Sequence, residues 1–135
     1  MTINISGKVI RGEGYGKKLG FPTANIDRRD FVRRKLKVKL GIYAGFAELN
    51  LKSSSSAKAS ADKKILNLKS AIVVGPLDKD YLPKIEAHLV GFKGNLYGKK
   101  LTIILKKYLR PFKQFKSEAE LKAQIAKDVK KAKSL

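Results

Sequence analysis

The stretch GEGYGKKLGFPTANID, residues 12–27, is the segment from which the fold and function of this chain are best predicted. Its first half alternates three glycines with other residues: Gly12, Gly14 and Gly16. Such glycines let the backbone approach a ligand closely and point N–H groups at it. Lys17 and Lys18 follow, and either could pair with phosphate oxygens. A turn between two strands also favours alternating glycine, so a phosphate site and a plain turn both stay open.

The end of the same stretch, Pro22-Thr23-Ala24-Asn25, adds more specific chemistry. Proline restricts its own backbone and favours extended geometry in the residue before it. Thr23 and Asn25 are two positions apart, so in an extended segment both side chains point the same way. A hydroxyl and an amide oxygen suit Mg²⁺, which takes most of its charge balance from substrate phosphates. The alternative is that both side chains bond to backbone groups at a turn, and the residue types do not decide between them.

Outside this stretch, short apolar segments separated by glycine turns predict strands. Residues 84–90, KIEAHLV, alternate strictly, and residues 71–74, AIVV, are typical of a buried strand that Gly75 and Pro76 would close. Further strands are expected at residues 3–10, 41–49 and 101–105. Many short strands of this kind indicate a mainly β fold, a small antiparallel barrel.

Residues 52–64, KSSSSAKASADKK, interrupt the pattern of strands. This segment is low in complexity and has too few apolar side chains to pack into a core. We expect it to be a surface loop inside a single domain that spans residues 1–135, since neither side of it holds enough strands for a core of its own.

Near the C-terminus, SEAELKAQIAKDVKKAK predicts an amphipathic helix. Leu121, Ile125 and Val129 recur every four residues and form one apolar stripe. Ser117 followed by Glu120 is a capping-box signature. Lysines crowd the last turn, where the helix dipole favours positive charge. We expect this helix to lie on the barrel.

The strand at residues 84–90 carries a candidate general base. Strict alternation places its apolar residues on one face and Glu86 and His88 on the other. A carboxylate among apolar neighbours in a cleft can act as a general base. On pattern alone, an exposed glutamate that pairs with a lysine is the favoured interpretation. His88 is the only histidine and lacks partners for a metal site, so it is interpreted as a structural or surface residue.

The composition limits the classes of partner. Lys and Arg number 31 against 11 Asp and Glu, so the formal net charge is +20, which attracts polyanions such as nucleic acid and nucleotides. The lysines are scattered along the chain, which favours a solvated surface over one binding face. Cysteine is absent, so disulfides and thiolate metal sites are excluded. No apolar run reaches the roughly 18 residues of a membrane span. We expect a cytoplasmic protein with no membrane partner.

Four segments, taken in order, resemble the ATP-dependent riboflavin kinase (flavokinase) family. They are GKVIRGEGYGKKLGFPTANI, GIYAG, KIEAHLVGFKGNLYGKKLTI and LRPFKQFKSEAELKAQIAKD. The GFPTAN hexapeptide with its upstream glycines is specific, and the resemblance covers nearly the whole chain apart from residues 52–64. It implies a six-stranded antiparallel Greek-key barrel with a C-terminal helix.

The resemblance also implies the reaction of riboflavin and ATP to give FMN and ADP. Thr23 and Asn25 would then hold Mg²⁺ and touch the nucleotide phosphates, and Glu86 would be the catalytic base. Arg110 and the loop after it would close over the flavin. The residues implied around ATP are Gly12, Gly14, Lys17 and Lys18, with either lysine as the phosphate ligand.

Many family members carry a preceding nucleotidyltransferase domain that makes FAD, and this chain begins about a strand ahead of the glycine loop. FAD synthesis is therefore not expected, and neither is a specific nucleic-acid partner. We expect a monomer. Two alternatives remain: a small basic β-barrel that binds nucleic acid, and a module that binds a flavin or a nucleotide without catalysis.

Overall fold

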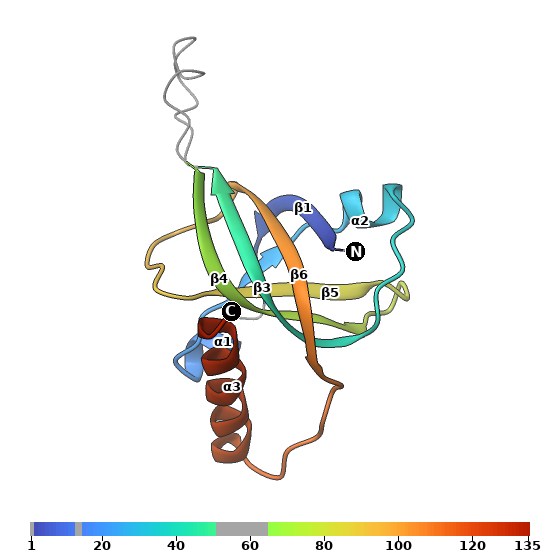
Figure 1. Ribbon diagram of the computed structural model, residues 1–135. Helices are drawn as coiled ribbons and strands as arrows, with labels where there is room; N and C mark the ends of the chain where they lie inside the picture. Colours follow the sequence, from blue (N-terminus) through green and yellow to red (C-terminus); the bar gives the residue numbers. More distant parts are fainter. Residues whose placement is uncertain (1, 13–14, 51–64) are drawn as a thin grey trace.

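The computed structural model describes residues 2–12, 15–50 and 65–135. Its centre is a closed barrel of six antiparallel strands (Figure 1). The strands are β1 (Ile3–Ile10), β2 (Ala24–Ile26), β3 (Gly41–Asn50), β4 (Ile65–Leu77), β5 (Pro83–Leu89) and β6 (Lys100–Arg110). Around the barrel their order is β1-β2-β5-β4-β3-β6. Strand β6 returns to lie beside β3 after the β3–β4–β5 meander, which is a Greek-key connection. The predicted fold class is confirmed.

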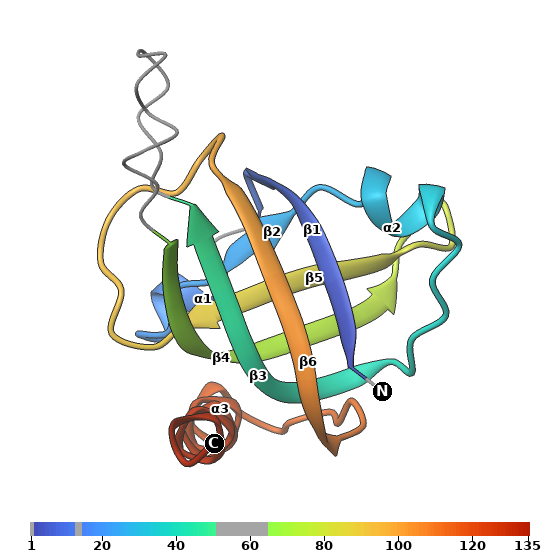
Figure 2. The ribbon, with the colours of Figure 1, turned by 45° about the horizontal axis from the view of Figure 1, so that its top comes forward.

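Three helices accompany the barrel: α1 (Tyr15–Lys18), α2 (Arg29–Arg33) and α3 (Glu118–Lys133). Figure 2 shows α2 beside β1, whereas α1 and α3 lie on another side of the barrel. Helix α3 begins as predicted, because the Ser117 hydroxyl accepts a hydrogen bond from the Glu120 N–H at 3.2 Å. Within the described residues, no helix combines the length and apolarity that crossing a membrane would require.

The barrel interior is filled by side chains that alternate along each strand. On β5 the buried residues are Pro83, Ile85, Ala87 and Leu89, and the last three confirm the apolar face predicted from the sequence. The largest fully buried apolar side chains in the interior are Ile5, Ile26, Leu49, Ile72, Ile85, Leu101, Ile103 and Val74. Burying such side chains supplies the main driving force for closing the barrel.

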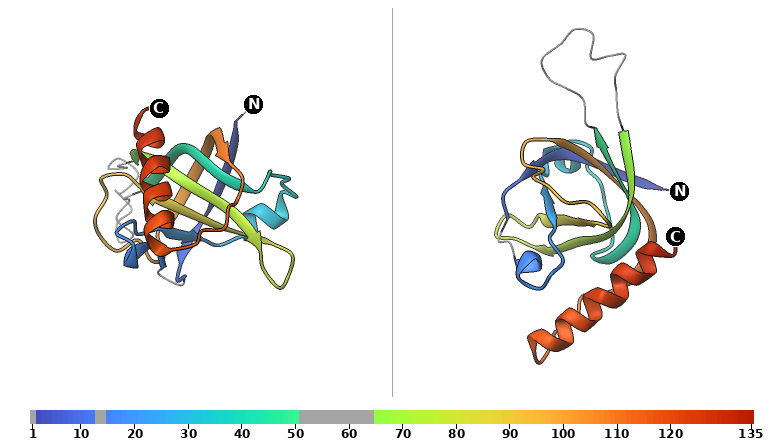
Figure 3. Two further views of the ribbon diagram at one scale, coloured as in Figure 1. Left: turned by 90° about the horizontal axis from the view of Figure 1, so that it is seen from below. Right: turned by 90° about the vertical axis from the view of Figure 1, so that its left-hand side faces the viewer.

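Helix α3 packs on the outside of the barrel from its middle to its C-terminal end, beginning at Ile125. Val129 and Ala132 near its C-terminus form a second buried cluster with Ala44 of β3 and Ala71 of β4. Small side chains on the strands let the helix approach closely. Figures 1 and 3 show the N-terminal end of α3 projecting away from the strands. The N-terminal end of α3 therefore does not pack into the barrel core and can line a cavity outside it.

Position 45 on β3 must be glycine, because the backbone of β6 passes too close to it for a side chain. A Cβ atom at this position would lie 1.9 Å from the carbonyl oxygen of Ile104 on β6. The pairing of β3 with β6 also shifts register between Ala44 and Gly45. An irregularity of this kind bends a strand and helps a small barrel to close.

Two strands are longer than predicted. Strand β4 begins at Ile65 and continues through Gly75 and Pro76, so the prediction that these residues close the strand was wrong. A register shift between Val74 and Leu77 accommodates the proline, which has no N–H for the ladder. Strand β6 continues from the predicted residues 101–105 to Arg110. The predicted surface loop at residues 52–64 lies outside the described residues.

Candidate active site

Four polar side chains share one face of the β2–β5 pair. Asn25 lies opposite Glu86 in the ladder, and Ala24 lies opposite Ala87. The hydroxyl of Thr23, one residue before β2, donates to Oε1 of Glu86 at 3.3 Å. Because side chains alternate along a strand, Thr23 and Asn25 point to the same side as Glu86 and His88. The structure thus brings together three residues that the sequence singled out separately.

These four side chains line a cavity of about 740 Å³, which we call the larger cavity. It lies among the barrel wall, the segment after β6 and the N-terminal half of α3. Its apolar lining includes Phe21, Ile42, Val73, Phe112, Phe115, Leu121 and Ile125. A largely apolar cavity of this size with a few convergent polar groups is typical of a small-molecule site.

A second cavity of about 550 Å³, the smaller cavity, adjoins the first. The segment between β5 and β6 supplies much of its lining, including Phe92, Lys93, Asn95 and Tyr97. Both lysines of α1 are exposed, but Lys17 lines the smaller cavity whereas Lys18 lines neither cavity. Between the two lysines, the fold therefore directs Lys17 toward a site.

The two cavities share a wall made of Gly12, Thr23 and Asn25. Glu86 lines only the larger cavity, on the far side of this wall from Lys17. Two ligands, one in each cavity, would therefore meet at Thr23 and Asn25. The carboxylate of Glu86 would lie on the side of the larger cavity, and the ammonium group of Lys17 on the side of the smaller cavity. Such an arrangement suits the transfer of a charged group from one ligand to the other.

Gly12 is a member of the shared wall because it has no side chain. A Cβ atom there would lie 2.0 Å from Nδ2 of Asn25, so the amide of Asn25 occupies the space of the missing methyl group. The sequence predicted Gly12 for its backbone freedom, and the structure adds this steric reason. Gly14 lies outside the described residues.

Gly12→Ala is expected to push the Asn25 amide out of the shared wall and to weaken the binding of a charged ligand at this wall by about tenfold or more, since one lost hydrogen bond to a charged group costs roughly 1.5–3 kcal/mol. The measurement is ligand affinity in a double-mutant cycle with Asn25→Ala. If displacement of Asn25 is the cause, Gly12→Ala has little further effect in the Asn25→Ala protein. Additive losses would contradict this explanation.

Arg110 also lines the larger cavity, but its guanidinium group already has a partner. Nε and Nη2 of Arg110 donate to the carboxylate of Asp128 on α3, the shortest contact being 2.7 Å. The two side chains are only 17% and 4% exposed. Gln124 donates to the same carboxylate at 3.1 Å. Arg110 thus ties β6 to α3 and fixes one wall of the cavity.

Sequence reasoning missed Asp128, although a signal was present. It is an acidic residue adjacent to the apolar stripe of α3, directly before Val129. An acidic side chain that is buried beside such a stripe requires a cationic partner. The sequence did not show which cation would be the partner, because Arg110 lies on a strand and reaches Asp128 only in the folded chain.

A second ion pair holds another arginine that lines the larger cavity. Arg28 donates to the carboxylate of Asp78 in the turn after β4 and also to the carbonyl of Leu82 at 3.3 Å. The hydrogen bond from Arg28 lowers the pKa of Asp78 below its usual value, and backbone N–H groups of the turn add to this. Arg28 is thereby held in place at the cavity lining.

The barrel and its two adjoining cavities define a class: a small β-barrel domain with two neighbouring cavities that share a polar wall. The chain belongs to the riboflavin kinase family, because the Flavokinase family model, described as riboflavin kinase, matches residues 1–135. The predicted family membership is confirmed.

Curated relatives agree with this assignment. The riboflavin kinase of Homo sapiens is 33% identical over 129 residues, which cover 94% of this chain and 76% of that protein. The bifunctional riboflavin kinase/FMN adenylyltransferase of Escherichia coli K12 is 32% identical over 92% of this chain. This chain spans only 35% of the length of that bifunctional relative.

A solved structure has the same fold. The crystal structure of riboflavin kinase from Trypanosoma brucei superposes with a TM-score of 0.72 at 22% identity, and the match covers 98% of this chain and 78% of that chain.

Proposed function

We propose that this chain transfers the γ-phosphate of ATP to the ribityl 5′-hydroxyl of riboflavin, giving FMN and ADP. Family membership supports this reaction. The observation that carries the site assignment is the shared wall, with Glu86 facing the larger cavity and Lys17 facing the smaller. The proposal extends to kinase activity only and does not include FAD synthesis.

The larger cavity is assigned to riboflavin. Its apolar and aromatic lining, including Phe112 and Phe115, suits the flat isoalloxazine ring. Leu121 and Ile125 on α3 complete this lining. The tie between Arg110 and Asp128 holds α3 over the flavin, so Arg110 contributes by shaping the wall. The ribityl chain would then point toward Thr23 and Glu86 at the shared wall.

The smaller cavity is assigned to ATP. Lys17 would meet the phosphates there, and the aromatic rings of Phe92 and Tyr97 offer apolar surface to the nucleotide. Thr23 and Asn25 supply a hydroxyl and an amide oxygen, hard neutral donors of the kind Mg²⁺ accepts beside phosphates. Within the described part of the chain, no group of three acidic, histidine or cysteine side chains could hold a metal by itself. Mg²⁺ held by Thr23, Asn25 and the nucleotide would neutralise phosphate charge.

The chemical step needs an oriented hydroxyl more than covalent work by the protein. Glu86 would accept the proton of the ribityl 5′-hydroxyl as its oxygen bonds to the γ-phosphorus. The bond from that phosphorus to the β,γ-bridging oxygen breaks, and ADP leaves with the electron pair. Thr23, which donates to Glu86 at 3.3 Å, keeps the carboxylate directed at the shared wall.

Lys17→Ala is expected to raise the KM for ATP by about tenfold, the effect of losing one charge-assisted phosphate contact. Lys18→Ala is the matched control, because Lys18 is exposed like Lys17 but lines neither cavity. Steady-state kinetics at saturating riboflavin provides the measurement. The assignment of Lys17 fails if both variants have the same KM for ATP as the parent protein.

The proposed activity is tested by incubating the protein with riboflavin, ATP and Mg²⁺ and separating FMN by chromatography. FMN that accumulates with ADP in equal amounts supports the proposal. No FMN across a range of divalent metals and nucleotides would overturn it. Binding of riboflavin or ATP without turnover would favour the alternative of a non-catalytic module.

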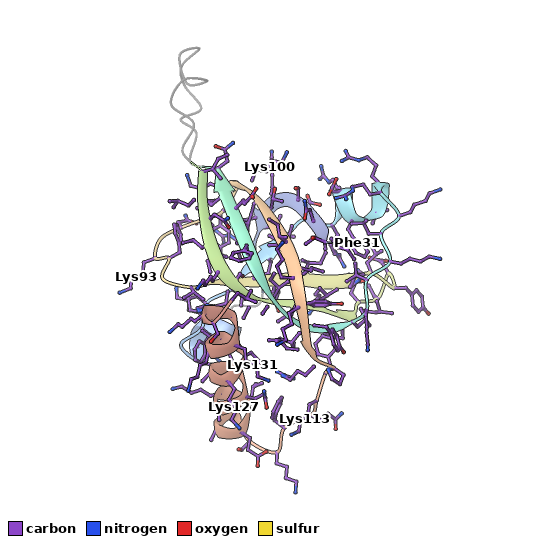
Figure 4. All side chains as sticks on the ribbon, viewed as in Figure 1. Phe31, Lys93, Lys100, Lys113, Lys127 and Lys131 are labelled. Carbon is purple, nitrogen blue, oxygen red and sulfur yellow. The ribbon has the colours of Figure 1, made fainter. Side chains whose placement is uncertain are left out.

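Nucleic-acid binding is not favoured by the distribution of charge. Figure 4 shows labelled lysines on separate parts of the molecule: Lys93 after β5, Lys100 at the start of β6, Lys113 after β6, and Lys127 and Lys131 on α3. No aromatic row accompanies them in the described residues, as base stacking would require. A monomeric state, one domain over residues 1–135 and a cytoplasmic location stay predictions that accompany this proposal.

A further inference from the structure

His88 makes a polar contact that the reaction proposed above does not use. Its Nδ1 atom lies 2.8 Å from the carbonyl oxygen of Pro22, a residue 66 positions earlier in the chain. The imidazole also packs edge-on against Phe21, with ring centroids 5.7 Å apart. The side chain is half-buried and lines the larger cavity. Of the two interpretations that the sequence left open for His88, a structural or a surface residue, these contacts favour the structural one.

The strand register places His88 beside the shared wall. Asn25 pairs with Glu86 and Ala24 pairs with Ala87, so continuing the ladder by one residue sets Thr23 opposite His88. Opposite residues of an antiparallel pair have their side chains on the same face. Strand β2 begins at Ala24, so within the described residues the β2–β5 ladder does not extend to the Pro22–Thr23 peptide. The contact from His88 is what secures its carbonyl oxygen to β5.

The chemistry of the contact sets the tautomer of the imidazole. A backbone carbonyl can only accept a hydrogen bond, so Nδ1 of His88 must carry the proton. In the neutral ring, Nε2 is then the unprotonated nitrogen. The hydrogen bond to Pro22 therefore needs the proton on one particular nitrogen. Packing of the ring alone would not select a tautomer.

We propose that His88 is a positioning residue for phosphoryl transfer: by holding the Pro22 carbonyl it keeps the Thr23 hydroxyl at the shared wall and within reach of Glu86. The chain of contacts runs from His88 to Pro22, through one peptide to Thr23, and across to Glu86 at 3.3 Å. This inference rests on the proposed riboflavin kinase activity.

The first test is spectroscopic and does not depend on activity. The chain has one histidine, so a long-range ¹⁵N–¹H spectrum contains a single imidazole pattern. At about pH 8.5, where an ordinary imidazole is neutral, we expect the Nδ1–H tautomer rather than the Nε2–H form. An Nε2–H pattern in the parent protein would overturn the inference.

The second test uses three substitutions that separate the hydrogen bond from the volume of the ring. His88→Asn places an amide N–H near the position of Nδ1, His88→Gln places one near Nε2, and His88→Leu fills the space without a donor. We expect kcat to fall about tenfold in His88→Leu and His88→Gln, the effect of one lost hydrogen bond, and to be largely restored in His88→Asn. The KM for riboflavin should change little in all three.

A purely structural role would give a different order. His88→Leu, which is closest in volume, would then be the most active variant, and His88→Asn would raise the KM for riboflavin by opening the cavity; either result would overturn the inference. If the parent protein makes no FMN, the proposed function fails on its own. The inference is then decided by amide shifts of Thr23, which should change in His88→Leu and stay near the parent values in His88→Asn.

Discussion

Glu86→Gln is expected to lower kcat by about 100-fold or more while leaving the affinity for riboflavin nearly unchanged. Glutamine keeps the size of the side chain and can still accept the hydrogen bond that Thr23 donates to Oε1. It cannot take a proton from the attacking hydroxyl. The loss should therefore fall on the chemical step, because the apolar lining that would bind the flavin ring is untouched. Stopped-flow or steady-state formation of FMN gives kcat, and quenching of flavin fluorescence gives the affinity.

Glu48→Gln is the matched control for this experiment. Glu48 lies on β3, is partly buried like Glu86, and lines neither cavity. Its replacement should leave kcat within about twofold, as is usual for substitutions away from a site. The assignment of Glu86 as the base would be abandoned if Glu86→Gln turned over as fast as Glu48→Gln.

Asp128→Asn is expected to lower the free energy of unfolding by about 3 kcal/mol and to raise the KM for riboflavin. The substitution keeps the shape of the side chain but removes the charge that balances the Arg110 guanidinium, which is itself only 17% exposed. An uncompensated buried charge is costly. The same change weakens the tie between β6 and α3, whose Leu121 and Ile125 line the larger cavity.

Asp80→Asn provides the comparison for Asp128→Asn, since Asp80 is exposed in the turn after β4. Urea denaturation monitored by circular dichroism measures stability, and kinetics at saturating ATP measures the KM for riboflavin. We expect Asp80→Asn to match the parent protein in both. Equal stability of the two variants would show that the Arg110–Asp128 pair makes no net contribution to the free energy of unfolding. An unchanged KM for riboflavin would show that α3 does not contribute to flavin binding.

The elements that the sequence predicted well are those with a clear hydrophobic period. Strand β5 alternates strictly, and α3 carries an apolar residue every four positions, so both were located within about one residue. The extent of β4 was underestimated because residues 65–70 have few buried side chains and are strand only through pairing with β3. Strand β2 is only three residues long, and a period cannot be recognised in so short a segment.

Thr23, Asn25 and Glu86 were proposed as site residues through the family resemblance, because the residue pattern alone left a turn and an exposed glutamate as alternatives. That these three lie together is a result of the β2–β5 ladder. The contacts that support them were not foreseen, because each joins residues far apart in the chain. Asp128 pairs with Arg110 across the gap between helix and strand, and His88 bonds to Pro22 across 66 positions.

Periodicity and motifs are local properties of a chain, so the kind of fold, the C-terminal helix and the residue types needed for phosphoryl chemistry could be predicted without a structure. The separation of two cavities by Gly12, Thr23 and Asn25 became visible only in the closed barrel. The tertiary structure also decided that Lys17 rather than Lys18 faces one of them, and that Arg110 is bound to Asp128. The physical reason is that a cavity and a buried ion pair arise from closing the barrel, which brings distant segments into contact.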